Sequence, residues 1–229
     1  MKKKFIFVIL CTTLFSEIYV HAQDWPNFER YRAANSQLGA PKSHETRVVF
    51  LGNSITDFWI NAFPDFFSSH NYIDRGISGQ TSPQMLVRFR ADVIDLHPKV
   101  VVIEAGTNDI AGNTGPSTLG MIEDNFTSMC ELAKANHIRV VLSSVLPVFD
   151  YPWHKGLQPA EKIITLNQWI KQYAAKHGFV YLDYFTPFVD ERNGFKSQYT
   201  IDGVHPNKAG YEVMMPLAEK AIKLALHQK

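Results

Sequence analysis

The sequence predicts an α/β protein in which a parallel sheet is covered by helices on both faces. Several short runs are apolar at every position rather than at alternate positions, as in Val48–Leu51 and Val100–Ile103. Strands that are buried on both faces have this composition, which is typical of parallel sheets. Between these runs the apolar residues recur at helical spacing. Strands that alternate with amphipathic helices indicate a three-layer α/β/α sandwich.

The predicted strands follow one another at intervals along the chain. They cover residues 47–51, a stretch near 71–74, and residues 99–105, 139–145 and 179–182. Right-handed crossovers between parallel strands bring all of their carboxyl ends to one edge of the sheet. Ligands of such folds bind along that edge, at the point where the strand order reverses.

The predicted helices occupy the segments between the strands and a segment before the first one. They cover residues 24–38, 82–96, 119–133, 159–173 and the stretch from 206 onward. Pro98 ends the second of these helices, whereas Pro159 and Pro206 stand at first helical positions, which proline favours. Pro216 lies inside the last helix and has no backbone N–H, so we expect a kink or a later start there.

Residues 1–22 have the layout of a secretory signal peptide. A basic start at 2–4 precedes an apolar stretch at 5–15 that is too short to span a bilayer. Ala22 ends a triplet of the type that signal peptidases cleave, so we expect a mature chain from about Gln23, exported to the periplasm or secreted. The alternative is that the segment stays in place as a membrane anchor.

The expected mature chain, residues 23–229, has the size of a single domain. It carries 20 Lys and Arg against 21 Asp and Glu, so no basic field exists to attract nucleic acid or an anionic membrane. We therefore expect no nucleic-acid partner, and no stable membrane insertion once the signal is removed. Cys130 is the only cysteine left, so the fold must depend on a hydrophobic core rather than on an internal disulfide.

Four polar segments follow predicted strands or precede the last helix. Ser54 follows the first strand in Gly-Asn-Ser-Ile-Thr, Gly79 follows the second in Gly-Ile-Ser-Gly-Gln-Thr, and Asn108 follows the third in Gly-Thr-Asn-Asp. Asp202 and His205 stand three residues apart near the end of the chain. The common edge of the strands is where these segments can meet.

These residue types suit nucleophilic attack on an acyl carbon. His205 can take the proton of Ser54, and Asp202 can hold the far nitrogen of the imidazole ring. The oxyanion that forms needs donors fixed in advance. The Ser54 N–H, the Gly79 N–H and the neutral side-chain amide of Asn108 are candidates. Each residue taken alone has a structural alternative, as a helix cap, a turn residue or a helix start.

Together the four segments resemble the signature blocks of the SGNH hydrolases, also called GDSL-type esterases and lipases. The four signature residues of that family match Ser54, Gly79, Asn108 and His205, and Asp202 takes its Asp-x-x-His position. The blocks occur in the family's order. The resemblance implies a flavodoxin-like parallel sheet of about five strands and a cofactor-free hydrolase of acyl esters, with a Ser-His-Asp relay.

Several residues lie outside this assignment. Asn53 stands where the family usually has Asp, which leaves open the contact that the Asp makes elsewhere. Glu104 lies in an apolar strand, either as a satisfied structural group or as a contact to a substrate hydroxyl. Trp153 and His154 belong to an aromatic loop after the fourth strand, where they could contact a sugar ring or an acyl chain. Asp109 is interpreted as structural. No His or Asp has metal-ligand spacing, so we expect no metal and no cofactor.

The sequence therefore predicts an exported serine esterase that removes small acyl groups, O-acetyl in particular, from a small-molecule or carbohydrate ester. A lysophospholipase or thioesterase of the same family is the alternative enzyme, and a long apolar channel would favour it. A carbohydrate-binding module that kept the fold without turnover is the alternative outside enzymes. A flavodoxin-like cofactor binder is conceivable from the fold alone.

Overall fold

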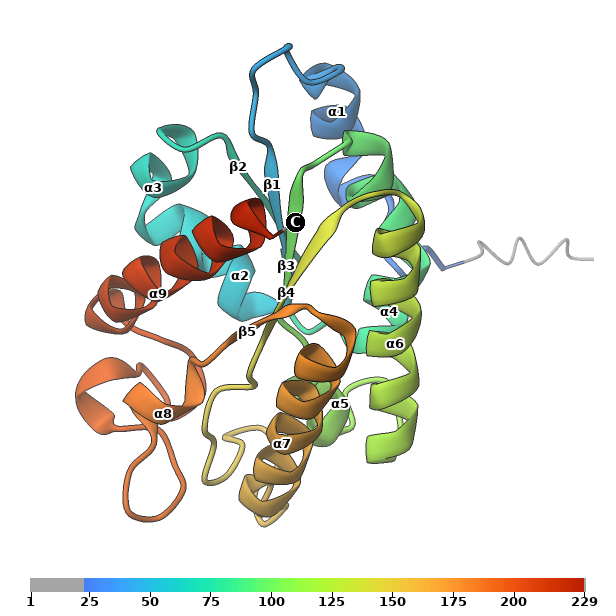
Figure 1. Cartoon of the computed structure of the whole chain (residues 1–229). Coiled ribbons are helices and arrows are strands. Elements are labelled where there is room, and N and C mark those ends of the chain that lie inside the picture. The colour runs from blue at the N-terminus through green and yellow to red at the C-terminus, as the bar shows by residue number, and fades with distance from the viewer. Residues whose placement is uncertain (1–22, 229) are drawn as a thin grey trace, which may run out of the picture.

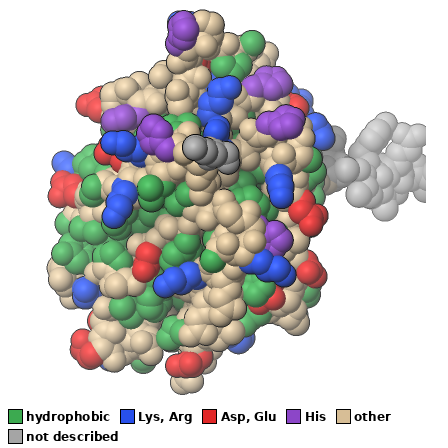
Figure 2. All heavy atoms as spheres, viewed as in Figure 1, with side chains coloured by type: hydrophobic (Ala, Val, Ile, Leu, Met, Phe, Trp, Pro, Cys, Tyr) green, Lys and Arg blue, Asp and Glu red, His purple; other side chains and the backbone are tan. Residues whose placement is uncertain are grey.

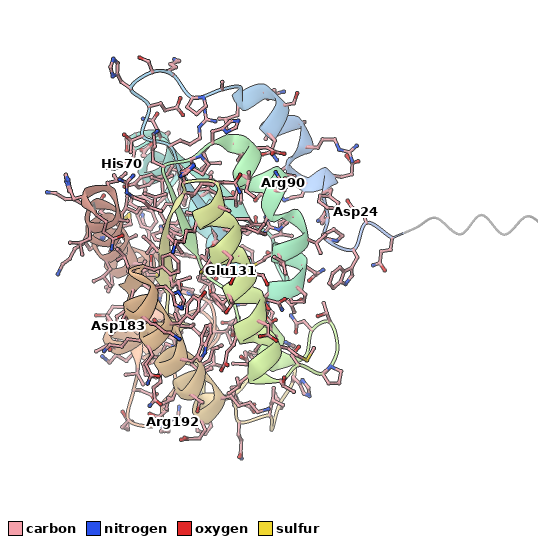
Figure 3. All side chains as sticks on the ribbon, turned by 45° about the vertical axis from the view of Figure 1, so that its right-hand side comes forward. Asp24, His70, Arg90, Glu131, Asp183 and Arg192 are labelled. Atoms are coloured by element: carbon pink, nitrogen blue, oxygen red, sulfur yellow. The ribbon has the colours of Figure 1, made fainter. Side chains whose placement is uncertain are left out.

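The computed structural model describes residues 23–228, so the predicted signal peptide and its cleavage position lie outside the described residues. Within that range, no helix combines the length and the apolar composition that crossing a bilayer requires. Figure 2 shows Lys and Arg side chains interspersed with Asp and Glu over the visible face, with no broad field of one sign. Charged groups such as Asp24, Arg90, Glu131 and Arg192 lie on the helices and loops around the sheet (Figure 3).

A parallel sheet of five strands forms the centre of the molecule. Its strands are β1 (Val48–Gly52), β2 (Tyr72–Gly76), β3 (Val100–Ile103), β4 (Arg139–Ser143) and β5 (Val180–Leu182). Their order is β2-β1-β3-β4-β5, and all neighbouring pairs are parallel. The predicted flavodoxin-like sheet is confirmed. The strand order reverses beside β1, which places the predicted ligand edge at the end of β1.

Successive residues of each strand enter different hydrophobic cores. Val49 and Leu51 pack into one core with Met85 and Phe126, whereas Phe50 packs into the other. The apolar runs in the sequence arise because the sheet is buried on both faces.

Helices cover the two faces in separate layers (Figure 1). They are α1 (Glu29–Leu38), α2 (Ser54–Ala62), α3 (Pro64–Ser68), α4 (Ser82–Asp92), α5 (Thr107–Ala111), α6 (Leu119–Ala135), α7 (Ala160–His177), α8 (Phe185–Phe188) and α9 (Lys208–His227). The layer with α4, α6 and α7 covers one face, and α2, α3 and α9 cover the other (Figure 1). Helix α1 packs on α4, outside the sheet, as predicted.

Two predicted helices differ in detail. The helix predicted over 82–96 ends at Asp92, because Val93 leaves the helical region at φ −129°, and a separate 3-10 turn covers Ile94–Leu96. The last helix begins after Asn207, whose side chain accepts a hydrogen bond from the Gly210 N–H. It continues through Pro216, so the predicted later start is wrong.

Candidate active site

The nucleophile candidate occupies the turn between β1 and α2. Ser54 is the first residue of α2 and is 7% exposed. The Asn53 side chain caps the helix by accepting a hydrogen bond from the Ile55 N–H at 2.8 Å. The N–H groups of a first helical turn have no acceptor within the helix, so the Ser54 N–H is available to a ligand.

A chain of two hydrogen bonds links Ser54 to the loop before α9. Ser54 Oγ lies 2.9 Å from His205 Nε2, and His205 Nδ1 lies 2.7 Å from Asp202 Oδ2. With the ring proton on Nδ1, the ring donates to Asp202, and Nε2 is free to accept the hydroxyl proton of Ser54. The structure thus brings Ser54 to a His-Asp pair that lies about 150 positions further along the sequence.

Backbone groups hold Asp202 in its ionised form. Partial burial acts to raise its pKa, but hydrogen bonds from the His205 and Val204 N–H groups and from the His205 ring outweigh it, so the pKa lies below its usual value. The carboxylate therefore keeps its charge into the acid range and can favour the imidazolium form of His205.

The oxyanion-hole candidates lie around the same crevice. Ser54, Gly79, Asn108 and His205 all line a crevice of about 280 Å³. Gly79 has φ +79°, which a side chain would strain. One hydrogen of the Asn108 amide is donated to the Gln80 carbonyl at 2.9 Å, which fixes the amide and leaves its second hydrogen for another acceptor.

A buried arginine that the sequence analysis missed ties these loops together. Arg88, on α4, is fully buried and donates to the Gly52 carbonyl beside the nucleophile turn. The same guanidinium donates to the Gln80 side chain at 2.6 Å and to Asp92 at 3.0 Å. Gln80 in turn holds Asn108. One side chain thereby couples the turn at Ser54 to the oxyanion-hole candidates, and only the folded structure reveals it.

Asp109 has a structural environment. Its carboxylate accepts the backbone N–H of Ser82 at 3.0 Å and the Ser82 hydroxyl at 2.6 Å, at the start of α4. Burial raises its pKa, and the Ser82 hydrogen bonds offset part of that rise. An anion at a helix N-terminus is favourable. The carboxylate therefore anchors α4 to the loop that carries Asn108.

Glu104 does not reach the crevice. The residue is 4% exposed, and neither carboxylate oxygen makes a hydrogen bond of good geometry within residues 23–228. Burial raises its pKa to about 7, and the nearby Asn53 side chain and backbone N–H offset part of the rise. Glu104 is not among the residues that line the crevice, which speaks against a contact to a substrate hydroxyl, and Asn53 is the neighbouring donor that a structural role would use.

Aromatic side chains flank the histidine. The rings of Phe58 and Trp153 lie 5.3 Å and 6.2 Å from the ring of His205, and both line the crevice. The predicted Trp153 is 47% exposed, and its indole N–H donates to Asn113 at 3.2 Å. His154 instead donates from Nδ1 to the Ala111 carbonyl at 2.8 Å and is not among the residues that line the crevice.

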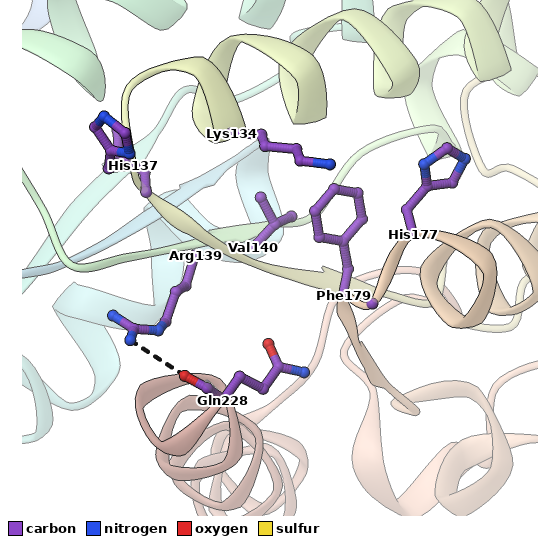
Figure 4. Close-up of a pocket in the computed structure, with 9 residues that line it drawn as sticks. Lys134, His137, Arg139, Val140, His177, Phe179 and Gln228 are labelled. Carbon is purple, nitrogen blue, oxygen red and sulfur yellow. Dashed lines mark hydrogen bonds between the residues drawn. The ribbon is translucent and has the colours of Figure 1, made fainter.

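A larger hollow, of about 570 Å³, lies at the other edge of the sheet (Figure 4). Lys134, Arg139 and His177 line it, and Arg139 donates to the Gln228 carbonyl at 3.2 Å. It contains none of the predicted site residues. In the described part of the chain, no three His, Cys, Asp or Glu side chains gather as a metal site would require.

The chain matches the model of the GDSL-like lipase/acylhydrolase family over residues 50–213. It is 48% identical to a candidate acylhydrolase from Bacteroides fragilis, with a TM-score of 0.88 over 90% of this chain and 100% of that one. A GDSL-like lipase from Bacteroides thetaiotaomicron is also 48% identical, with a TM-score of 0.86 over 88% of this chain and 100% of the other.

Two more distant matches share only the fold or only a short stretch of sequence with this chain. An acetyl-xylooligosaccharide esterase from Geobacillus, studied as a mutant, shares the fold at 17% identity, with a TM-score of 0.62 over 80% of this chain and 97% of that one. The uncharacterized lipoprotein YqeF of Bacillus subtilis is 31% identical over 81 residues. That match spans about a third of each protein, 34% of this chain and 33% of the lipoprotein.

Proposed function

The chain belongs to the GDSL-like lipase/acylhydrolase family, and from that membership we propose that it is a serine esterase that removes small acyl groups, acetyl in particular, from carbohydrate. The observation that carries the proposal is the hydrogen-bonded series Ser54–His205–Asp202, of which Ser54 and His205 line the crevice. A hydroxyl paired with a neutral imidazole, and an imidazole paired with a carboxylate, are the parts that acyl transfer needs.

In the proposed reaction, Ser54 Oγ attacks the acyl carbon while its proton passes to His205 Nε2. The tetrahedral oxyanion accepts hydrogen bonds from the Ser54 and Gly79 N–H groups and from the Asn108 amide. Collapse breaks the ester bond, and His205 returns the proton to the leaving alcohol. Water then attacks the acyl-serine with His205 again as base, which releases the carboxylic acid and restores Ser54.

The hollow beside the crevice supports a substrate in which a short acyl group is attached to a hydroxyl-rich carrier. A second hollow, of about 320 Å³, continues from it and shares Ser78, Gly79 and Asn113. Its other walls are mainly polar, with Asp24, Asn27, Gln80, Gln84 and Thr114, and the apolar side chains among them are Ile77 and Trp25. Polar side chains with exposed aromatic faces suit sugar rings, whereas a long acyl chain needs an apolar channel.

The segment that forms the far wall is attached to the catalytic loops. Gln80 donates to the Pro26 carbonyl and Gln84 donates to the Trp25 carbonyl, both at 2.7 Å. Trp25 is 40% exposed, so its ring is available to a ligand. The distant fold neighbour named as an acetyl-xylooligosaccharide esterase agrees with a carbohydrate substrate.

We propose further that residues 1–22 are a signal peptide and that residues 23–229 form a single exported hydrolase domain. The layout of the first 22 residues supports this, and the partial likeness to a lipoprotein agrees with export. Mass spectrometry of the protein secreted or exported by its host tests the cleavage position. A mature chain that still begins at Met1 would contradict the assignment.

Labelling with a fluorophosphonate probe tests the nucleophile. We expect one adduct, on the peptide that contains Ser54, and a loss of p-nitrophenyl acetate hydrolysis on the order of 10⁵–10⁶-fold in Ser54→Ala. Labelling of another peptide, or full turnover by the variant, would disprove the assignment.

A substrate panel then separates the enzyme alternatives. p-Nitrophenyl esters of rising chain length and acetylated sugars should give the highest kcat/KM for acetyl groups. A steady rise with acyl length would favour the lysophospholipase or thioesterase reading. Sugar binding without any turnover would favour the binding module.

A further inference from the structure

A set of buried polar atoms without hydrogen bonds lies beneath the nucleophile turn. Within residues 23–228 the set contains Asn53 Nδ2, both carboxylate oxygens of Glu104, Ser143 Oγ, Tyr184 OH and Trp59 Nε1. Buried polar groups in native proteins are nearly always satisfied, so a cluster of this kind needs a physical explanation.

The sheet register brings these groups together. Glu104 follows the last residue of β3, and its N–H donates to the Leu51 carbonyl, beside the end of β1. Ile103 pairs with Leu142, so Ser143 lies next to Glu104 across the sheet. Successive side chains point to opposite faces, so both face the core that contains Trp59 and Tyr184.

Asn53 is the group of this set that touches the catalytic machinery. Its Oδ1 accepts the Ile55 N–H, which leaves Nδ2 as a buried donor. The neighbour that offers acceptors is Glu104, whose pKa the Asn53 side chain and backbone N–H lower against the larger effect of burial. Asn53 directly follows β1 and Glu104 directly follows β3, and these two strands are parallel neighbours, so the donor and the acceptor lie close together beside Ser54.

This arrangement explains the residue that departs from the family pattern. An Asp at position 53 could still cap α2 with one oxygen. Its second oxygen would face the Glu104 carboxyl group, and two buried carboxyl groups must share a proton or repel each other. An Asn supplies a hydrogen-bond donor instead, so Asn53 complements Glu104 chemically.

We propose that Asn53 and Glu104 act as a pair of positioning residues, a buried donor and acceptor that hold the turn of Ser54 in its reactive orientation. This inference rests on the proposed function, because it assigns a role in the reaction of Ser54. The pair does not contact the substrate. Its effect reaches the chemistry through the position of the Ser54 hydroxyl and N–H.

The titratable groups around Glu104 come from four elements. Asp109 of α5 adds to the rise in its pKa, and Tyr151, Tyr184 and Tyr211 lie near enough for its charge to raise theirs. The raised pKa of Glu104, about 7, places its change of charge near neutral pH. The protonated carboxyl group of Glu104 is neutral, whereas the ionised carboxylate places a buried negative charge near Ser54.

An exchange of donor and acceptor tests the pair. We expect Asn53→Asp to lower kcat for p-nitrophenyl acetate by about 10-fold, with the greater loss at alkaline pH, because a small displacement of a reacting group is costly. KM should stay within about twofold. Adding Glu104→Gln should restore most of kcat, since an amide then faces the carboxylate again with the roles exchanged.

Two further variants complete the design. Glu104→Leu removes the acceptor and should lower kcat while KM is kept, which covers the case in which Asn53→Asp does not fold. Asp74→Asn is the matched control, because Asp74 is also buried, has a pKa raised by burial to about 7 and has an oxygen without a hydrogen bond. Asp74 pairs with Phe50 in the sheet and accepts hydrogen bonds from the Tyr31 hydroxyl and the Gly76 N–H rather than from Asn53, so this variant should leave kcat and its pH profile unchanged.

The outcomes separate the two proposals. If the probe labels Ser54 but Asn53→Asp and Glu104→Gln act additively on kcat, or Asp74→Asn changes the pH profile as strongly, the positioning pair is disproved. If Ser54 is not labelled, the proposed function itself fails.

Discussion

The two halves of the candidate site are built in different ways. The nucleophile half, with Ser54 and Asn108, is nearly buried and depends on side chains from distant segments, among them Arg88. The histidine half is a short loop in which Asp202 binds the backbone and ring of His205 three residues away. It is more open, with side-chain exposures of 36% for Asp202 and 15% for His205.

This difference predicts how substitutions in each half should affect catalysis and stability. In the histidine half the orienting contacts are local, so a substitution there should remove chemistry and leave the fold intact. In the nucleophile half the same side chains hold strands and loops together. Substitutions there should change stability and rate together.

After the loss of the nucleophile itself, the largest effect on the rate is expected in the histidine half. Asp202→Asn should lower kcat by about 10³–10⁴-fold, because an amide no longer favours the imidazolium and can hold the ring in the wrong tautomer. The melting temperature should change little, since the residue is partly exposed and its loop is short. Steady-state kinetics with a thermal melt checks both. A large drop in melting temperature would show that the contacts of Asp202 stabilise more of the fold than this short loop.

In the nucleophile half, Arg88→Met should cost about 3–5 kcal/mol in the free energy of unfolding, because it leaves Asp92 buried without its cation. Denaturant unfolding at neutral pH measures the loss. Arg90→Met is the matched control. Arg90 lies two positions away on α4, its side chain is 66% exposed, and its ion pair with Asp95 is long at 3.9 Å. This exposed pair should be worth about 1 kcal/mol or less. Equal losses in the two variants would refute the role of Arg88.

Asn108→Ala should lower kcat and kcat/KM alike by about 10²–10³-fold, the usual effect of losing one oxyanion donor. Because the amide also holds the Gln80 carbonyl, a modest fall in melting temperature should accompany the kinetic effect. Asp109→Asn is the comparison, and it should lower stability more than the rate of the folded fraction. A rise in KM with kcat unchanged would make Asn108 a substrate contact instead.

The smallest effects concern pH, and the two halves should respond with opposite sign. The pKa of Glu104 is higher in the folded state than in the unfolded state. The stability that the protonated carboxyl group contributes is therefore fully present below the unfolded-state pKa and is lost as the pH rises towards about 7. Glu104→Gln should therefore gain stability relative to wild type between pH 5 and 8, by on the order of 1–3 kcal/mol.

The folded-state pKa of Asp202 is depressed, so its contribution is present at neutral pH and is lost as the pH falls through that pKa. The stability difference between wild type and Asp202→Asn should shrink in acid. Unfolding curves from pH 3 to 8 measure both differences. The same direction of change in the two variants would contradict the contrast between the halves.

Much of the architecture follows from the sequence. Apolar runs and helical spacing predicted the parallel sheet and its covering helices, because burial on both faces restricts which residues a strand can carry. The segments around Ser54, Gly79, Asn108 and His205 were predictable as neighbours, because parallel strands bring their carboxyl ends to one edge.

Other features were decided only by the tertiary structure. Nothing in the sequence pattern around Arg88 distinguishes it from the exposed Arg90. The role of Arg88 depends on carbonyl groups of β1 and β2, which precede α4 in the sequence. The sequence showed that Glu104 is unusual because it lies in an apolar strand, but it did not predict that the side chain would be buried away from the crevice. The physical reason is that local patterns record which face of an element is buried. The partners that meet a buried polar group come from segments distant in sequence, and only the packed fold brings them together.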